Sequence, residues 1–145
     1  MAGIEKAFLQ LRIQQKNRDV TRFLWIKDLT KLEVIDDNVI VYRFCRVPFG
    51  LICSPFLLLA TIKFHLLKEG SPLALNILNN IYVDNVLFGV DSVGDACKAY
   101  YEAKTIFDKC SMNLREWNSN SKEFLASLPD GRRTRPGRRS APPAS

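Results

Sequence analysis

Histidine is almost absent from this sequence, and its few cysteines do not cluster. The only histidine is His65, and the four cysteines stand apart at positions 45, 53, 97 and 110. Structural zinc sites need closely spaced ligands such as Cys-x-x-Cys, so the sequence predicts no zinc site. Cys45 follows Phe44 and Cys53 follows Ile52, and such apolar contexts predict small buried side chains in a reducing compartment.

Long hydrophobic runs are missing as well. The longest uncharged stretch, residues 47–62, contains two prolines and a glycine and is shorter than the ~20 residues that span a bilayer. We therefore interpret it as core. The N-terminus has no basic segment followed by an apolar one, so we expect no signal peptide. The sequence predicts neither a secreted nor a membrane-inserted protein, and a cytoplasmic location is compatible with it.

The composition is that of an ordinary globular chain, with 145 residues, 47% of them hydrophobic and 25% charged. The net charge of +6 is unevenly placed, because residues 129–145 carry +4 and the rest only +2. A mildly basic globular part allows a nucleic-acid partner without predicting one. The last stretch is rich in arginine, proline and glycine and cannot bury a core. We expect a domain over residues 1–128 and a disordered Arg/Pro-rich tail over 129–145.

The pattern of apolar residues predicts an α+β fold. Residues 4, 7, 8 and 11 match one helical face, and strands expected at 20–26 and 39–47 should pair as a long hairpin. Ser54 and Pro55 indicate the start of a helix over 56–68, with Ser54 as its N-cap. Asp91-Ser92 and Ser119-Asn120-Ser121 are expected to cap helices over 93–109 and 122–128, with a strand at 112–117 between them. Such an order favours an antiparallel sheet with helices packed on one face.

Two short apolar runs flank Asp84 and Asn85 within residues 81–89, which predicts a tight hairpin with these two side chains at its tip. Asp and Asn favour turns for local hydrogen-bonding reasons, so an ordinary turn is one interpretation. A carboxylate held rigidly as a metal ligand is the other. The hairpin by itself leaves both open, whereas Asp36 and Asp37 are interpreted as a solvated turn.

Four motifs occur in order along the chain. Residues 4–11 read Ile-Glu-Lys-Ala-Phe-Leu-Gln-Leu, and residues 42–56 contain Tyr-Arg-Phe, Arg-Val-Pro-Phe-Gly-Leu and Ser-Pro-Phe. Residues 82–85 read Tyr-Val-Asp-Asn, and residues 114–120 begin with Leu-Arg-Glu-Trp and end with Ser-Asn. Together they resemble the palm domain of reverse transcriptases from BEL/Pao-type LTR retrotransposons, in truncated form. The resemblance covers about residues 2–128.

The resemblance implies RNA-directed DNA polymerisation by two-metal nucleotidyl transfer, with Mg²⁺ as cofactor. The implied partners are an RNA template, a DNA primer and deoxynucleotides. Asp84 matches the hairpin aspartate that ligates the catalytic magnesium, and Asn85 stands where most members have a second aspartate. Tyr82 and Val83 would lie near the primer end.

The resemblance also implies a nucleotide-binding group. Phe8 matches the aromatic residue beneath the sugar of the incoming nucleotide, where it would exclude a 2′-hydroxyl. Pro48, Phe49 and Gly50 match a loop against which the nucleotide and the template base pack. Without the neighbouring motifs, simple core packing would be the interpretation for Phe8 and Phe49.

The sequence departs from the family pattern at the first strand. The family has an aspartate immediately before the position of Ile4, where this chain has Gly3, which offers no ligand atom. Magnesium prefers carboxylate oxygens, and the polymerase fingers and thumb are not represented either. We therefore expect no polymerisation by this chain alone.

Two alternatives remain. One is a non-catalytic nucleic-acid-binding remnant that uses the tail, and the other is a small globular protein with no nucleic-acid role. The tail arginines could contact phosphates without sequence preference, or the tail could have no role. These arginines are Arg132, Arg133, Arg135, Arg138 and Arg139.

Overall fold

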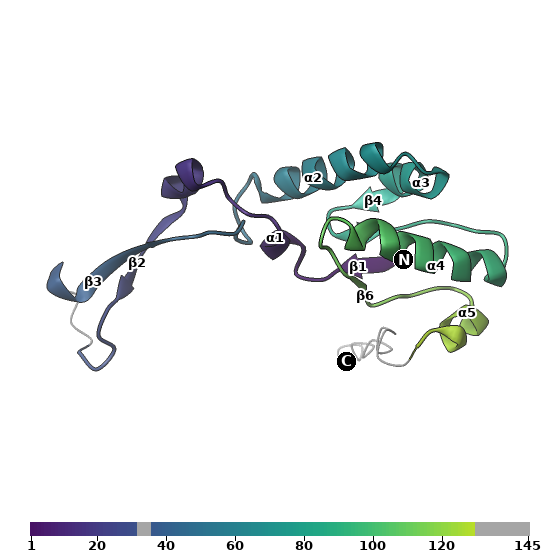
Figure 1. The fold of residues 1–145 in the computed structure, drawn as a ribbon. Coiled ribbons are helices and arrows are strands. Elements are labelled where there is room, and N and C mark those ends of the chain that lie inside the picture. The colour runs from purple at the N-terminus through teal and green to yellow at the C-terminus, as the bar shows by residue number, and fades with distance from the viewer. Residues whose placement is uncertain (32–35, 130–145) are drawn as a thin grey trace, which may run out of the picture. The chain divides into compact units, whose positions relative to one another are not determined.

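The computed structural model describes residues 1–31 and 36–129, and Figure 1 shows its helices and strands. The chain divides into two units. One unit combines Met1–Glu5 with the chain from Leu59 onward, and the other comprises Lys6–Leu58. The tail predicted from residue 129 lies outside the described residues, except for Pro129. No helix among the described residues is both long and apolar enough to cross a membrane.

A four-stranded antiparallel sheet is the framework of the first unit. Its strands are β4 (Ile81–Tyr82), β5 (Asn85–Val86), β1 (Ala2–Ile4) and β6 (Leu114–Arg115), in that spatial order. The strand from the start of the chain thus occupies a central position, and Figure 1 shows it beside β6. Successive side chains of a strand point to opposite faces of the sheet. Ala2 and Ile4 of β1 are accordingly buried, whereas Gly3 between them is not.

Helices complete this unit, and serine side chains cap three of them. They are α3 (Pro72–Asn80), α4 (Val93–Asp108) and α5 (Lys122–Ser127). Ser71, Ser92 and Ser121 each accept a hydrogen bond from the backbone N–H three residues further on. These bonds satisfy donors that the first helical turn leaves unpaired, which fixes where each helix begins. Helix α4 contacts α3, α5 and β6.

Aromatic side chains form the core beneath α4. The ring of Tyr100 lies 4.6 Å from that of Trp117 and 6.5 Å from that of Phe124, both in edge-to-face contact. Tyr100 and Trp117 are almost fully buried, as is Phe107 from the same helix. Edge-to-face pairs of this kind add about 0.5–1.5 kcal/mol beyond the area that they bury. The core therefore fixes α4, α5 and the segment just after Arg115 to one another.

Helix α2 (Ser54–Glu69) begins in the second unit, and its residues from Leu59 belong to the first. Two polar contacts tie its C-terminal half to α4. His65 Nε2 donates to the carbonyl of Ile106 at 2.7 Å, and Lys109 donates to Glu69 at 2.5 Å. The Lys109 ammonium lowers the pKa of the Glu69 carboxyl. Gly70, with φ of +61°, then ends the helix in the left-handed conformation that glycine favours.

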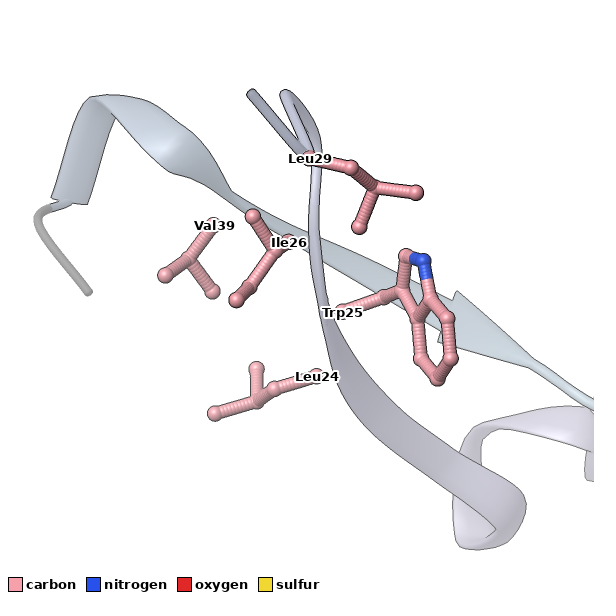
Figure 2. A pocket seen from close by; sticks show the side chains of 5 residues that line it. All are labelled: Leu24, Trp25, Ile26, Leu29 and Val39. Atoms are coloured by element: carbon pink, nitrogen blue, oxygen red, sulfur yellow. The ribbon is translucent and has the colours of Figure 1, made fainter. Parts of the chain in front are cut away.

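The second unit contains an antiparallel hairpin of β2 (Arg22–Ile26) and β3 (Val39–Arg43), paired from Arg22↔Arg43 to Ile26↔Val39. A one-turn helix α1 (Ala7–Gln10) and the 3₁₀ segments η1 (Gln15–Thr21) and η2 (Asp36–Asn38) complete its regular structure. Figure 2 shows Val39, Ile26 and Leu24 gathered on one side of the hairpin, where they line an apolar pocket with Trp25 and Leu29. At the other end, Asp19 pairs with both Arg22 and Arg43, which lowers the pKa of its carboxyl.

The α+β class predicted from the sequence is confirmed, as is the long hairpin between β2 and β3. The predicted capping segments are confirmed too, and within them Ser92 and Ser121 are the residues that cap. The prediction of one helical face through residues 4–11 is wrong. Ile4 ends a strand, and only Ala7–Gln10 is helical, because Lys6 takes a left-handed conformation with φ of +48°. Pairing of β1 with both neighbours outweighs the local helical pattern.

Three further predictions need correction. Helix α3 was not predicted, although Ser71-Pro72 repeats the Ser-Pro start signal seen at Ser54. Ser54 itself is not a cap, because α2 already includes it and its hydroxyl donates to the carbonyl of Pro48 at 2.8 Å. The strands are also shorter than predicted, ending at Arg43 and spanning only Leu114–Arg115.

Candidate functional site

The hairpin of β4 and β5 turns through two residues, Val83 and Asp84. Tyr82 pairs with Asn85 on either side of them, so Asn85 is the first residue of β5 and not part of the tip. This corrects the predicted Asp-Asn turn. Val83 has φ of +54°, a conformation that is strained for a β-branched residue. The turn therefore holds Asp84 at the tip with a strained residue immediately before it.

Strand β1 brings the start of the chain against this hairpin. Gly3 pairs with Asn85 on one side and with Arg115 on the other. The N–H of Ile4 donates to the carbonyl of Asp84 at 2.8 Å. Directly opposed residues of antiparallel strands share a face of the sheet. Tyr82, Asn85, Gly3 and Arg115 thus form a row across one face, which we call the open row.

The opposite face of the same strands is core. Ala2, Ile4, Val86 and Leu114 are all buried there. By contrast, Tyr82 is 73% exposed and Arg115 is exposed, while Asn85 and Gly3 are partly exposed. The face that carries the open row is therefore the side of this sheet that is accessible to another molecule.

Two carboxylates flank the open row in different surroundings. On the hairpin side, the amide of Asn85 donates to Asp84 Oδ1 at 3.0 Å, which places the Asp84 carboxylate beside the open row. On the β6 side, Glu5 pairs with Arg115 and accepts from Asn113 Nδ2 at 2.9 Å. The contacts of Glu5 are thus with β6 and with Asn113 just before it, whereas Asp84 is the carboxylate at the tip of the hairpin.

Glu116 is a neighbour of Gly3 that the sequence did not single out. A Cβ added at Gly3 would lie 4.0 Å from Glu116 Oε2 and 4.0 Å from the carbonyl oxygen of Arg115. The strand containing Leu114 was predicted, but its pairing partner was not. No sequence signal therefore pointed to a contact between positions 3 and 116.

The predicted nucleotide-binding residues lie in the second unit. The rings of Phe8 and Phe49 meet edge to face with centroids 5.7 Å apart, so the structure brings these two together. Phe49 is 88% exposed and Ile52 and Phe56 are exposed as well, so the interpretation of residues 47–62 as core is wrong at these positions. Pro48 accepts a hydrogen bond from Ser54, and Gly50 has φ of +95°. These four residues thus form one cluster, and Tyr82, Val83, Asp84 and Asn85 form another in the first unit.

The donor set around Asp84 does not fit the pair of magnesium ions that the family resemblance implies. Within residues 1–31 and 36–129, no three histidine, cysteine, aspartate or glutamate side chains gather where they could hold a metal ion. Asp84 offers one carboxylate, Gly3 offers no side-chain ligand, and the Asn85 amide hydrogens point at Asp84. Hard cations such as Mg²⁺ require several oxygen ligands, so this chain lacks part of the set.

No family model and no curated protein matches this chain.

Proposed function

We propose that this chain is a portion of a BEL/Pao-type reverse transcriptase palm that does not polymerise DNA by itself. Its lineage activity is RNA-directed DNA polymerisation on an RNA template with a DNA primer and deoxynucleotides. The observation that carries the proposal is the pairing of Gly3 with Asn85. The motif that begins at Ile4 and the Tyr82–Asn85 motif are far apart in sequence, yet their strands are neighbours.

The arrangement suits the chemistry of that lineage. Nucleotidyl transfer uses two metal ions ~4 Å apart to stabilise the attacking and leaving oxygens. A palm must therefore place carboxylates from two strands on one open face of a sheet. Position 3 and the Asp84 hairpin have that relation here, and the opposite face is buried.

The other roles in the proposal follow the resemblance. Asp84 is the retained metal ligand, and Asn85 supports it through the hydrogen bond to Oδ1. Tyr82 and Val83 belong to the primer side of the hairpin. Phe8 and Phe49, already in contact, belong to the nucleotide side. Because Gly3 provides no carboxylate, the set of ligands is incomplete.

A primer-extension assay tests the first half of the proposal. The full chain, supplied with a primed RNA template, deoxynucleotides and Mg²⁺, should extend no primer. Metal-dependent extension by the unmodified chain would refute the claim that it is inactive alone.

A transplant tests the ancestry. Residues 1–128 replace the corresponding palm segment of an active BEL/Pao reverse transcriptase, once with Gly3 and once with Gly3→Asp. We expect extension only from the Gly3→Asp chimaera, and its loss when Asp84→Asn is added. A Gly3→Asp chimaera that folds and binds primer–template but extends nothing would overturn the assignment to this family.

A further inference from the structure

We propose that the β2–β3 hairpin is a self-association surface, on which a second copy of this chain docks in the antiparallel orientation. The hairpin is a sheet of two strands, one of its faces is an exposed apolar strip, and its two ends carry opposite charge. The ancestry proposed for the chain plays no part in this surface.

Alternation along the paired strands puts four apolar side chains on one face of the hairpin. They are Leu24 and Ile26 of β2 with Val41 and Val39 opposite them, and we call them the hairpin strip. Leu24 is 69% exposed and Val41 is 57% exposed. Figure 2 shows Leu24, Ile26 and Val39 on one side of the hairpin, where they line a pocket of about 370 Å³. The hairpin strip is therefore a hollowed apolar surface that is open to solvent.

A hairpin of this kind is stabilised by a second layer. Its sheet contains only β2 and β3 in the part of the chain that the structure describes. An isolated two-stranded hairpin is marginally stable in water, and packing against another element stabilises it. On the opposite face, the ring of Phe23 stacks on that of Tyr42 at 5.8 Å and lies 4.8 Å from that of Phe44. The hairpin strip is thus the face that gains most from a partner.

The two ends of the hairpin differ in charge. The base, residues 16–22 and 43–46, has five basic side chains against Asp19 alone, a net charge of +4. The loop end, within residues 27–31 and 36–38, has three aspartates against two lysines, a net charge of −1. This negative end disfavours an anionic partner, such as a membrane surface or a nucleic acid, along the whole strip.

The polarity of the hairpin favours a second copy related by a two-fold axis. In that arrangement the two hairpin strips cover each other, and the base of each copy lies at the loop end of the other. At the base, Arg22 and Arg43 line a second pocket of about 340 Å³ and both pair with Asp19. Two arginines against one carboxylate leave a positive charge there. The exposed Asp37 at the loop end of the second copy complements that charge.

The hairpin strip is short, so the dimer is weak and reversible. Five paired residues span about 17 Å along the strands. Such a surface is smaller than the roughly 800 Å² that each partner buries in a stable complex. We therefore expect the full chain to be monomeric when dilute and to dimerise at roughly 0.1–1 mM protein.

Sedimentation equilibrium of the full chain, up to millimolar protein, measures the dimer dissociation constant. Leu24→Lys should weaken the dimer by at least about tenfold, because it puts a charge where the interface buries apolar surface. Leu67→Lys is the matched control, since Leu67 is 53% exposed on α2 and belongs to the first unit. This control should dimerise like the unmodified chain.

Asp37→Lys tests the orientation of the two copies. It should weaken the dimer by about three- to tenfold at low salt and by less at high salt, because antiparallel copies lose an attraction that ions screen. In a parallel dimer the two loop ends would meet, and the same variant would strengthen association. Asp91→Lys, at an exposed aspartate of the first unit, is the charge control and should have little effect.

Hydrogen exchange of the unmodified chain gives a readout that needs no variant. The backbone amides of β2 and β3 should exchange more slowly as the protein concentration rises. A chain that stays monomeric at millimolar concentration would overturn the proposal, as would a dimer whose hairpin amides gain no protection. Equal dimerisation by Leu24→Lys would overturn it too, and Val41→Lys takes its place if that variant does not fold. An Asp37→Lys dimer as tight as the unmodified one would refute the antiparallel orientation.

Discussion

The strained residue at the hairpin tip allows a sharp test of the site's geometry. Val83 has φ of +54° in the two-residue loop before Asp84. A left-handed conformation costs an L-residue about 1–2 kcal/mol because its Cβ crowds the backbone, whereas glycine has no Cβ. Replacing Val83 also removes a partly buried side chain, so the informative comparison is between Val83→Ala and Val83→Gly.

The expected difference has a definite sign. Glycine loses about 0.5–1 kcal/mol relative to alanine through its greater freedom in the unfolded chain. Relief of about 1–2 kcal/mol of left-handed strain outweighs this loss. Val83→Gly should therefore be more stable than Val83→Ala by roughly 0.5–1 kcal/mol. In an exposed helix the order reverses, so Ala60→Gly within α2 should cost about 1 kcal/mol.

Urea unfolding followed by Trp117 fluorescence measures the difference, because Trp117 is buried in the same unit as the hairpin. With a slope of about 1–3 kcal/mol per molar urea, the two midpoints should differ by roughly 0.2–1 M. If Val83→Ala proves equally stable or more stable, the strained geometry assigned to the tip is wrong. A slope that differs between the two variants would point to an altered unfolded state instead.

Two further predictions concern a second glycine and an ion pair. Gly50→Ala should destabilise the Lys6–Leu58 unit by about 1–3 kcal/mol, because the φ of Gly50 is +95°. Gly89 lies in open space without a left-handed backbone, so Gly89→Ala should be neutral or slightly stabilising. Urea unfolding followed by tryptophan fluorescence compares the stability of the two variants. The pKa of Glu69 is lowered by Lys109 in the folded state, so its contribution to stability is present above the unfolded pKa of about 4.3 and is lost as pH falls through the folded value. Glu69→Gln should therefore lower the Tm at pH 6 and flatten its fall between pH 6 and pH 3, and Lys109→Gln added to it should change little; two additive losses would contradict the pairing.

Local sequence signals identified most of the elements. Ser92 and Ser121 stand before amphipathic stretches, and their hydroxyls can satisfy orphan N–H groups without help from the rest of the fold. The β-branched and aromatic residues at 22–26 and 39–43 predict strands, and the polar, irregular segment with a turn signal between them favours antiparallel pairing. Such features depend on neighbours within a few residues, so the chain alone specifies them.

Long-range pairing decided the rest. Residues 4–11 carry a helical pattern, yet Ala2–Ile4 forms a central strand because two other strands supply its hydrogen bonds. The turn at Val83 and Asp84 likewise follows from the pairing of Tyr82 with Asn85, and no local rule favours valine in a left-handed position.

The candidate site likewise combines features that the sequence shows with contacts that only the fold decides. Its residue types, Asp84, Asn85 and the glycine at position 3, were visible in the sequence and led to the family resemblance. The sequence could not show that Glu116 borders Gly3 or that Glu5 is held by Arg115. Those contacts depend on which strands become neighbours, and strand order is set by burial of Ala2, Ile4, Val86 and Leu114 on one shared face.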